Sequence, residues 1–437
     1  MSNNSKQWGA IIVMIALFAM IAFVTNLCTP MATIIKNQGD ISNVLAQIGN
    51  YGNFIAYLIM GIPAGMLIAK FGYKKTALIG LAIGAAGILI QWVSGLMDAQ
   101  ANLGLVFTVY LIGAFIAGLC MCILNCVVNP MLNILGGGGN EGNKLIQLGG
   151  VFNSSAAVAC YILMGALIGD VTKAKISDAT PALMIALAIF VVAFIVICFT
   201  KIKEPQQAPV QVSLIKGALS YRHFALGALA IFLYMGIEVG VPNYSQQLLI
   251  GEGIPAGTVG LIIAVYWFMM LIGRFVGASI GSKISARSMI VAVATATIVL
   301  VLFGMYAPES VKVNFPGVDW GNLAIVWQEI PLGIFAFLLV GLCTSVMWGA
   351  IFNLAVEGLG KYTAIASGIF MTMVFGCAVM LAIQGAVADA AGYYNSFWVV
   401  IACAAYLLFY ALIGSKPVSS KVSADEANAV NALEDAI

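Results

Sequence analysis

Two ionisable side chains, Glu238 and Arg274, lie inside long stretches of apolar sequence. Glu238 is the single acidic residue of IFLYMGIEVGVPNYSQQLLI, residues 231–250. A carboxyl group in apolar surroundings is costly to keep, and such groups usually mark a pathway or a binding site. We expect Glu238 either to take up and release a proton or to make a charge-assisted hydrogen bond to a ligand. A structural ion pair, or a neutral and hydrogen-bonded Glu238, is the alternative.

Arg274 lies near the end of its apolar stretch, beside a short basic loop. A similar loop follows an earlier apolar stretch. Lys70 and Lys74 in the earlier loop have the same spacing as Lys283 and Arg287 in the loop after Arg274. We expect Lys70, Lys74, Arg274 and Arg287 to act in gating, by holding one end of the protein closed. For Arg274 we favour this role, or pairing at a helix end, over contact with a substrate.

Amide side chains are the most numerous polar groups in these stretches. An amide both donates and accepts hydrogen bonds, which suits a neutral, hydroxyl-rich substrate better than an ion. The rings of Trp267 and Trp348 could cover the apolar face of a sugar. The candidate substrate-binding residues are Asn26, Asn53, Asn125, Asn129, Asn153, Asn243, Gln247, Trp267 and Asn353. Any one amide could equally join two helices, and a Trp is more often an anchor at a membrane surface.

The composition indicates which elements position these groups. Of 437 residues, 62% are hydrophobic and 8% are charged, whereas soluble domains carry roughly 25% charged residues. A membrane-spanning helix needs about 20 mostly apolar residues. Twelve runs meet this requirement: roughly 8–35, 45–70, 76–97, 104–135, 145–169, 181–200, 223–250, 257–282, 288–306, 328–356, 363–388 and 395–414. The sequence therefore predicts an all-α polytopic membrane protein with 12 transmembrane helices.

The basic residues predict how the chain is oriented in the membrane. With alternating spans, 14 of the 19 Lys and Arg residues fall on one side and 4 on the other, while Arg274 lies within a span. The side richer in Lys and Arg is normally cytoplasmic. We therefore expect both termini in the cytoplasm and the protein in the inner (plasma) membrane.

A polar stretch divides the twelve spans into two sets of six. Asn129 and Asn353 come shortly before Gly-rich turns in corresponding positions of the two sets, and the basic loops also correspond. Two matching halves indicate a transporter with its site between them, as in the major facilitator superfamily. The expected units are an N-terminal half (1–200), a cytoplasmic linker (201–222), a C-terminal half (223–414) and a polar cytoplasmic tail (415–437).

Six short motifs resemble the fucose–galactose–glucose:proton symporter family of this superfamily. They are NPMLNILG, GGVFNSSAAV, FLYMGIEVGV, GRFVGASI, IFNLAVEGLGKYTAIASG and GAVADAAG. The resemblance extends over roughly 10–415. It implies twelve helices, alternating access, and a hexose or deoxyhexose moved inward with a proton.

The chain departs from this family at two positions. The L-fucose symporter resemblance implies acidic residues with proton and sugar roles in the first span and before the Asn-Pro of the fourth span. Here these positions hold Asn26 and Asn125, which cannot titrate. Glu238 is then the only acidic side chain deep in a span, and we expect it to carry the coupling proton. The G-x-E-V pattern around it is similar to glucose and galactose members, which favours hexose over fucose.

The expected function is therefore secondary active sugar transport, by import with a proton, in a protein that contacts a small sugar and the lipid bilayer. We expect a monomer, no cofactor apart from a coupling proton or sodium ion, no metal site and no nucleic-acid partner. No nucleophile–base arrangement or metal-ligand spacing is present, so no enzyme activity is expected. The alternatives are an uncoupled or sodium-coupled sugar facilitator, a drug or metabolite exporter of the same fold, and a transporter-like sugar sensor.

Overall fold

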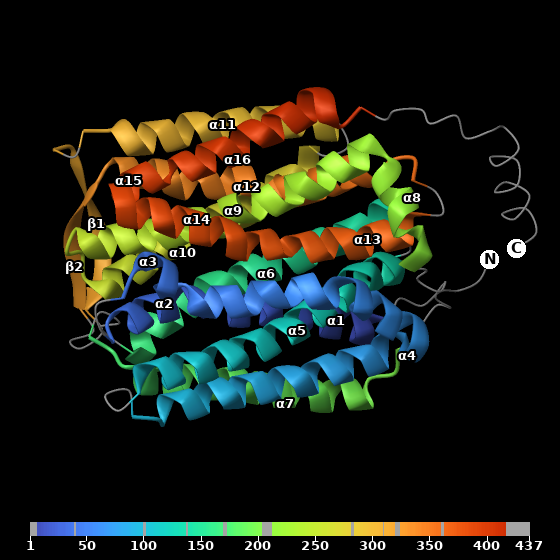
Figure 1. The fold of residues 1–437 in the computed structure, drawn as a ribbon, viewed down its shortest axis with the longest axis horizontal. Coiled ribbons are helices and arrows are strands. Elements are labelled where there is room, and N and C mark those ends of the chain that lie inside the picture. The colour runs from blue at the N-terminus through green and yellow to red at the C-terminus, as the bar shows by residue number, and fades with distance from the viewer. Residues whose placement is uncertain are drawn as a thin grey trace, which may run out of the picture.

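The protein is a bundle of long helices that run side by side along one direction (Figure 1). The structure is a computed structural model. It describes residues 7–38, 41–98, 102–136, 139–168, 173–202, 212–280, 284–308, 310–319, 324–359 and 362–416. A β-hairpin lies at one end of the bundle, called here the hairpin end. The first helix begins and the last helix ends at the opposite end, called the terminus end.

The helices before residue 200 pack together as one group, called the N-half. Its first span breaks at Leu27, because Pro30 has no N–H to donate to the carbonyl of Asn26. The elements of the N-half are α1 (Trp8–Asn26), α2 (Cys28–Lys36), α3 (Asn43–Ala46), α4 (Ile48–Gly95), α5 (Leu103–Leu135), α6 (Gly139–Ile168), the 3-10 turn η1 (Ile176–Ala179) and α7 (Thr180–Phe199).

The helices after residue 221 form the second group, called the C-half. Its elements are α9 (Arg222–Gly251), α10 (Ala256–Ile280), α11 (Ala286–Tyr306), β1 (Lys312–Asp319), β2 (Ala324–Pro331), α12 (Gly333–Val356), α13 (Thr363–Thr372), η4 (Met373–Phe375), α14 (Gly376–Ala391), α15 (Tyr393–Ser396), α16 (Trp398–Phe409) and the π-helical turn η5 (Tyr410–Gly414). The turn η2 (Val212–Leu214) and α8 (Ile215–Ser220) precede it. Within the expected linker, residues 203–211 lie outside the described residues, as does the tail from 417.

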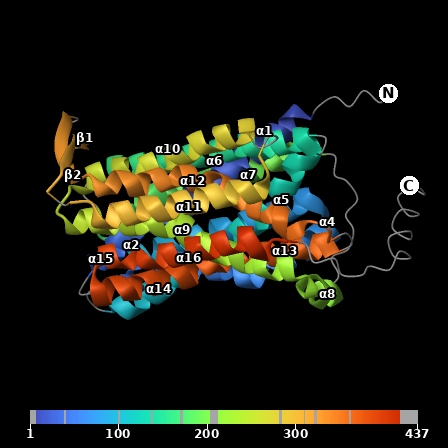
Figure 2. The ribbon, with the colours of Figure 1, turned by 90° about the horizontal axis from the view of Figure 1, so that it is seen from above.

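The twelve predicted spans are confirmed. Among the described residues, eleven helical segments are long and apolar enough to cross a membrane, and α4 contains two consecutive spans. The halves meet mainly where α6 packs against α10 and where α4 packs against α13 and α14. Figure 2 shows the same bundle from above, with the hairpin of β1 and β2 at one end and α8 at the other.

The predicted start of the tenth span is wrong. We expected a helix from residue 328, but residues 324–331 form β2, which pairs antiparallel with β1, and α12 begins only at Gly333. The stretch AIVWQEIP is rich in β-branched and aromatic residues, which favour strands. The apolar residues of this stretch therefore belong to a hairpin outside the helical bundle and not to a membrane span.

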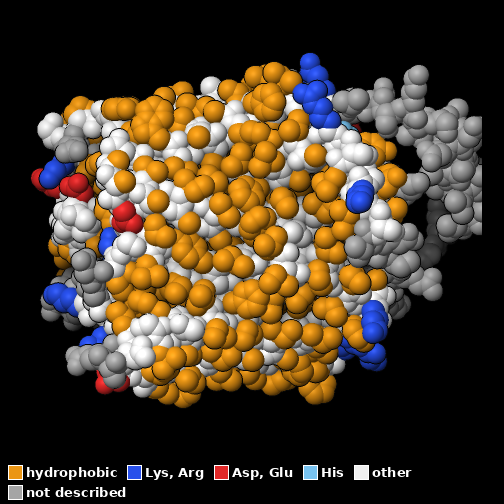
Figure 3. Space-filling model, viewed as in Figure 1, with side chains coloured by type: hydrophobic (Ala, Val, Ile, Leu, Met, Phe, Trp, Pro, Cys, Tyr) orange, Lys and Arg blue, Asp and Glu red, His pale blue; other side chains and the backbone are white. Residues whose placement is uncertain are grey.

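The outer surface of the bundle is apolar between its two ends. Figure 3 shows hydrophobic side chains over the middle of one face, with Lys, Arg, Asp and Glu gathered at the ends. Such a surface is stable against hydrocarbon, where helices satisfy their own backbone hydrogen bonds.

The sharp reversal inside α4 depends on Gly72. This residue has φ 79° and ψ 172°, in the midst of an otherwise continuous helical hydrogen-bond pattern. A residue with a Cβ atom is strained in that conformation. The loop that we expected between the second and third spans is thus a single-residue kink.

We predict that Gly72→Ala lowers the free energy of unfolding by about 1–3 kcal/mol, because alanine must adopt a backbone conformation that is almost restricted to glycine. Gly9→Ala in α1 is the matched control, since a Cβ atom there would meet nothing within 4 Å. Thermal unfolding of both variants in detergent measures the difference. Equal stability of Gly72→Ala and wild type would contradict the prediction.

Candidate functional site

A buried amide pair joins the two halves near the hairpin end. Gln47, just before α4, donates from Nε2 to Oδ1 of Asn243 on α9 at 2.6 Å, and Asn243 donates from Nδ2 to Oε1 of Gln47 at 3.0 Å. Asn50 also donates to Gln47 Oε1, at 2.7 Å. Gln47, Asn50 and Asn243 are all buried. Gln47 and Asn243 therefore pair with each other across the halves, and Asn50 supports Gln47 from within the N-half.

Two further amides of α9 extend this contact. Gln246 and Gln247 donate to the hydroxyl of Thr33 on α2, at 3.0 Å and 3.1 Å. Asn243 lies 3.4 Å from the hydroxyl of Thr29. We call this set, together with Gln47 and Asn50, the amide latch.

A second, charged contact lies at the hairpin end. Lys36 Nζ donates to Oδ1 of Asn43 at 2.5 Å and to the hydroxyl of Tyr393 at 2.6 Å. The carboxylate of Asp389 on α14 accepts from the backbone N–H of Asn43 at 2.9 Å and from its side chain at 2.6 Å. Asp389 also accepts from the N–H of Val44, so a residue of the C-half caps α3 of the N-half. The amide latch and this charged clasp together close the hairpin end.

Glu238 lies near the middle of α9, and a nearby proline leaves its backbone carbonyl without the usual helical donor. Pro242 cannot donate to the carbonyl of Glu238 four residues earlier. The hydroxyl of Tyr266 on α10 donates to this freed carbonyl at 3.0 Å, and it also lies 3.1 Å from the hydroxyl of Thr344 on α12. The backbone of Glu238 is thereby held by two neighbouring helices.

The carboxyl side chain of Glu238 interacts with two groups. The hydroxyl of Tyr234, one turn earlier on α9, donates to the carbonyl of Thr344 on α12 at 3.2 Å. The charge of Glu238 interacts electrostatically with Tyr234 and with Arg274 on α10. Trp348 stands edge-on to Tyr234, with 6.2 Å between ring centroids. An ionisable group, a phenol and an aromatic face thus lie together in the middle of the bundle.

Arg274 reaches from this site to the N-half. Its Nη1 donates to the backbone carbonyl of Gly150 on α6 and lies 3.4 Å from Oδ1 of Asn153. Asn153 in turn donates to the carbonyl of Phe18 on α1 at 2.8 Å. Of the predicted gating residues, Arg274 is therefore placed between the halves, toward the terminus end.

A third polar group lies on the N-half. Asn125 on α5 donates to the hydroxyl of Tyr57 on α4 at 2.9 Å, and Asn129 donates to the carbonyl of Asn125 at 3.1 Å. Both asparagines are only half-buried. Asn125 therefore joins α5 to α4 within the N-half.

Sequence comparison assigns the fold to a family. Residues 11–376 match the Major Facilitator Superfamily. The chain belongs to this superfamily. It is similar to the glucose/galactose transporter of Brucella abortus, with 30% identity over 429 residues that cover 95% of this chain and 96% of the relative.

More distant relatives agree with this assignment. The L-fucose-proton symporter of Escherichia coli is 23% identical over 407 residues, which cover 86% of each chain. A crystal structure of the transporter FucP in the outward conformation superimposes with a TM-score of 0.68 at 22% identity, over 93% of this chain and 98% of that one. This likeness supports the fold of a major facilitator protein.

The remaining candidate residues of this major facilitator protein occupy different environments. Asn26 donates to the carbonyl of Ala22 in its own helix at 2.8 Å. Trp267 is buried and packs edge-on against Tyr266, with ring centroids 5.3 Å apart. Asn53 is 2% exposed, and neither its Nδ2 nor its Oδ1 has a hydrogen-bond partner in the described part of the chain.

Arg287 and Asn353 meet in a pocket at the terminus end of the C-half. The pocket has a volume of about 420 Å³, and Glu357 also lines it. Arg287 donates to Ser415 at 3.3 Å. Asn353 is thus placed away from the amide latch with which we expected it to share a cavity.

The two gating lysines lie on α4 near the terminus end. Lys74 donates to the carbonyls of Cys198 and Thr200 at the end of α7, at 3.0 Å and 2.8 Å. Lys70 lies over the ring of Phe71, with its Nζ 5.2 Å from the ring centroid. These described contacts are within the N-half, so they do not test a gating role between the halves.

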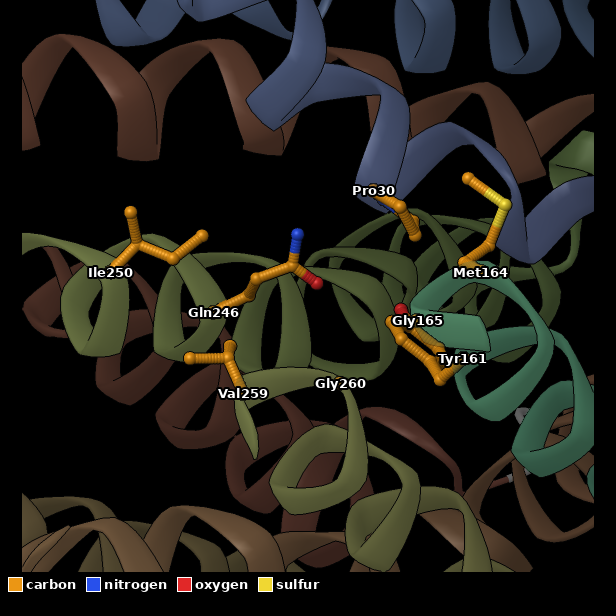
Figure 4. A pocket seen from close by; sticks show the side chains of 8 residues that line it. All are labelled: Pro30, Tyr161, Met164, Gly165, Gln246, Ile250, Val259 and Gly260. Carbon is orange, nitrogen blue, oxygen red and sulfur yellow. The ribbon is translucent and has the colours of Figure 1, made fainter. Parts of the chain in front are cut away.

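The amide latch leaves little space beside it. A cavity of about 20 Å³ lies between the halves, lined by Pro30 and Tyr161 on one side and by Gln246 and Val259 on the other (Figure 4). This volume holds about one water molecule. A sugar therefore cannot pass between the halves beside the amide latch while the latch is formed.

Several residues of the latch and clasp were not among the predicted site residues. They are Thr29, Thr33, Lys36, Asn43, Gln47, Asn50, Gln246, Asp389 and Tyr393. One signal was present for part of this set. Gln47, Asn50, Asn53 and Tyr57 follow the spacing of one helix face, which indicates a polar stripe leading from the latch to Asn125.

We predict opposite effects of removing a paired and an unpaired buried amide. Asn243→Ala leaves the Nε2 of Gln47 without its acceptor and should lower the free energy of unfolding by about 1–3 kcal/mol. Asn53→Ala removes an amide that has no partner and should leave this free energy unchanged or raise it slightly. Thermal unfolding in detergent compares the two variants, and a large loss for Asn53→Ala alone would show that its amide is paired.

Proposed function

We propose that this chain is a secondary active sugar transporter that imports a glucose- or galactose-like hexose with a proton by alternating access. The observation that carries the proposal is the similarity to a glucose/galactose transporter along 95% of this chain. Neutral amides that join the halves support it, because the same donors and acceptors suit sugar hydroxyls when the halves separate. The relatives are transporters, and no enzyme activity is proposed.

We assign the structure to the state in which the path to the hairpin end is closed. The amide latch and the charged clasp close that end. The sugar would lie on the terminus side of them, near Glu238, Trp348 and Asn125. Amide oxygens of Asn125 and Asn129 would accept from sugar hydroxyls, and Trp348 offers a ring face. Asn53, whose amide is unpaired in this state, is available to bind the sugar in another state.

We further propose that the terminus end faces the cytoplasm of a cell with this chain in its inner membrane. The excess of Lys and Arg on that side supports the orientation. An even number of spans also brings the start of α1 and the end of the last helix to the same end. The transporter is proposed to act as a monomer, since both halves of the pathway belong to one chain.

An uncoupled or sodium-coupled facilitator is the second candidate. Asn26 and Asn125 favour it, because neither can carry a proton at the positions where the fucose symporter resemblance implies acids. Glu238 favours proton coupling, because it is an ionisable group in the middle of the bundle that interacts electrostatically with both a phenol and an arginine.

We predict that Glu238→Gln abolishes accumulation of sugar but leaves equilibration. Glutamine keeps the size and hydrogen-bonding capacity of the side chain but cannot exchange a proton. The measurement is uptake of radiolabelled glucose, galactose and fucose into proteoliposomes, with and without an inward proton gradient. Glu252→Gln is the matched control, since Glu252 is exposed at the end of the same helix.

Three outcomes separate the candidates. Gradient-dependent accumulation by wild type and Glu252→Gln, but not by Glu238→Gln, supports the proton symporter. Equilibration without accumulation in all three proteins identifies a facilitator, and dependence on sodium identifies that ion. Accumulation by Glu238→Gln with wild-type affinity would show that Glu238 does not carry the proton.

A further inference from the structure

The hydroxyl of Tyr161 is a buried polar group that has no hydrogen-bond partner within the described ranges of the chain. Tyr161 lies on α6 of the N-half, and its side chain is 2% exposed. A buried hydroxyl without a partner lowers stability, and a phenylalanine would fill the same space without that cost. We therefore looked for a ligand that this hydroxyl could bind.

The Tyr161 hydroxyl faces the small cavity between the two halves. This cavity of about 20 Å³ is lined by Tyr161 and Met164 on α6 and by Gln246 and Val259 of the C-half. In Figure 4 the side-chain oxygen of Gln246 and the hydroxyl of Tyr161 are turned toward each other across the cavity. Each half therefore contributes one polar side chain to the same space.

The side-chain amide of Gln246 is held in one orientation by the N-half. Its Nε2 donates to the hydroxyl of Thr33 at 3.0 Å and to the backbone carbonyl of Thr29 at 3.3 Å. A side-chain amide donates only from its nitrogen and accepts only at its oxygen. Because the two threonines hold the nitrogen, the oxygen Oε1 is the atom that Gln246 presents to the cavity.

The cavity lies in a tightly packed part of the bundle, near the hairpin end. A Cβ atom added at Gly260 on α10 would lie only 3.2 Å from the backbone carbonyl oxygen of Tyr161. Gly260 and Val259 belong to the beginning of α10, which starts at the hairpin end. The space between Tyr161 and Gln246 is therefore not a result of loose packing between α6 and α10.

We propose that Tyr161 and Gln246 form an entry site for one hydroxyl group of the incoming sugar. This inference rests on the proposed function. The Tyr161 hydroxyl donates to the sugar oxygen, and the same sugar hydroxyl donates to Oε1 of Gln246. A carboxylate or phosphate group only accepts and an ammonium group only donates, so neither matches this pair as a hydroxyl group does.

The entry site changes size with the state of the hairpin end. When the amide latch breaks and the halves separate there, the site opens and takes the sugar before it reaches the groups around Glu238. When the end is closed, the remaining volume of about 20 Å³ holds about one water molecule. Water offers the same donor and acceptor as a sugar hydroxyl, so it can occupy the site between transport cycles.

The experiment asks whether one particular sugar hydroxyl pairs with Tyr161. Initial uptake of radiolabelled glucose is measured in cells that lack other hexose transporters, because added sugar then meets only the outer end of the protein. Unlabelled glucose and a set of monodeoxyglucoses, each lacking one hydroxyl group, compete with the label and give apparent affinities. Wild type is compared with Tyr161→Phe.

Tyr410→Phe is the matched control. Tyr410 is also buried, but its hydroxyl donates to the backbone carbonyl of His223 at 3.3 Å, within the C-half and near the terminus end. The same substitution is thereby made away from the cavity. Tyr410→Phe should keep the wild-type affinity for every sugar of the set.

We expect Tyr161→Phe to weaken the apparent affinity for glucose about fivefold, the scale of a neutral hydrogen bond. Its maximal rate should stay within about twofold of wild type. One monodeoxyglucose should bind Tyr161→Phe and wild type equally, because it lacks the hydroxyl group that Tyr161 contacts. A merely structural role of Tyr161 would weaken the affinities for all the sugars alike.

Gln246→Leu provides a second readout of the same site. It also disturbs the amide latch and should change all affinities by a common factor, but the same monodeoxyglucose should lose least. Unchanged glucose affinity in Tyr161→Phe, or an equal loss for all sugars, would overturn the inference. A different monodeoxyglucose for each variant would also overturn it, since the two residues would not share one hydroxyl. Failure of wild type to take up either glucose or galactose would overturn the proposed function itself.

Discussion

A polar side chain inside a membrane protein must find its partner within the protein, because hydrocarbon offers none. In this chain many of those partners lie on the opposite half of the bundle. Gln47 pairs with Asn243, Asp389 caps α3, and Arg274 reaches Gly150 and Asn153. The polar groups therefore hold the halves together, and separating the halves leaves these groups in need of other partners.

The need of each polar group for a partner connects closure of one end of the protein with binding of the sugar. A sugar offers many hydroxyl groups, and each can replace one donor or acceptor lost when a contact between the halves breaks. Hydrogen bonds between membrane helices contribute only about 0.6 kcal/mol each on average. A contact made of several such bonds can close an end of the protein and still open during a transport cycle.

Interruptions of the regular helical backbone also create groups that need hydrogen-bond partners. Pro242 frees the carbonyl of Glu238, and Tyr266 from the neighbouring helix donates to it. Pro30 interrupts the first span beside Asn26, and Gly72 reverses the chain between the second and third spans. Each departure from regular helix thus either receives a partner or changes the direction of the chain.

The amino-acid sequence is sufficient to predict the twelve spans, because the length and apolarity of each run depend on no other part of the chain. It also identified Glu238 and Arg274 as unusual, since an ionisable group in apolar sequence is evident without a partner. The end of β2, residues 328–331, was mistaken for part of a span, because apolar composition does not distinguish a short strand from a helix end.

Only the tertiary structure decided which polar groups meet. Gln47 and Asn243 are separated by almost half of the chain, and Lys36 and Tyr393 by more. Asn243 and Gln247 were predicted to bind substrate, and in this state they face Gln47 and Thr33 instead. A side-chain amide has the same donors and acceptors toward a sugar as toward another amide, so residue type could not choose between them. The placement of α9 opposite α2 and the residues just before α4 makes that choice, because it sets which partner lies within hydrogen-bonding distance.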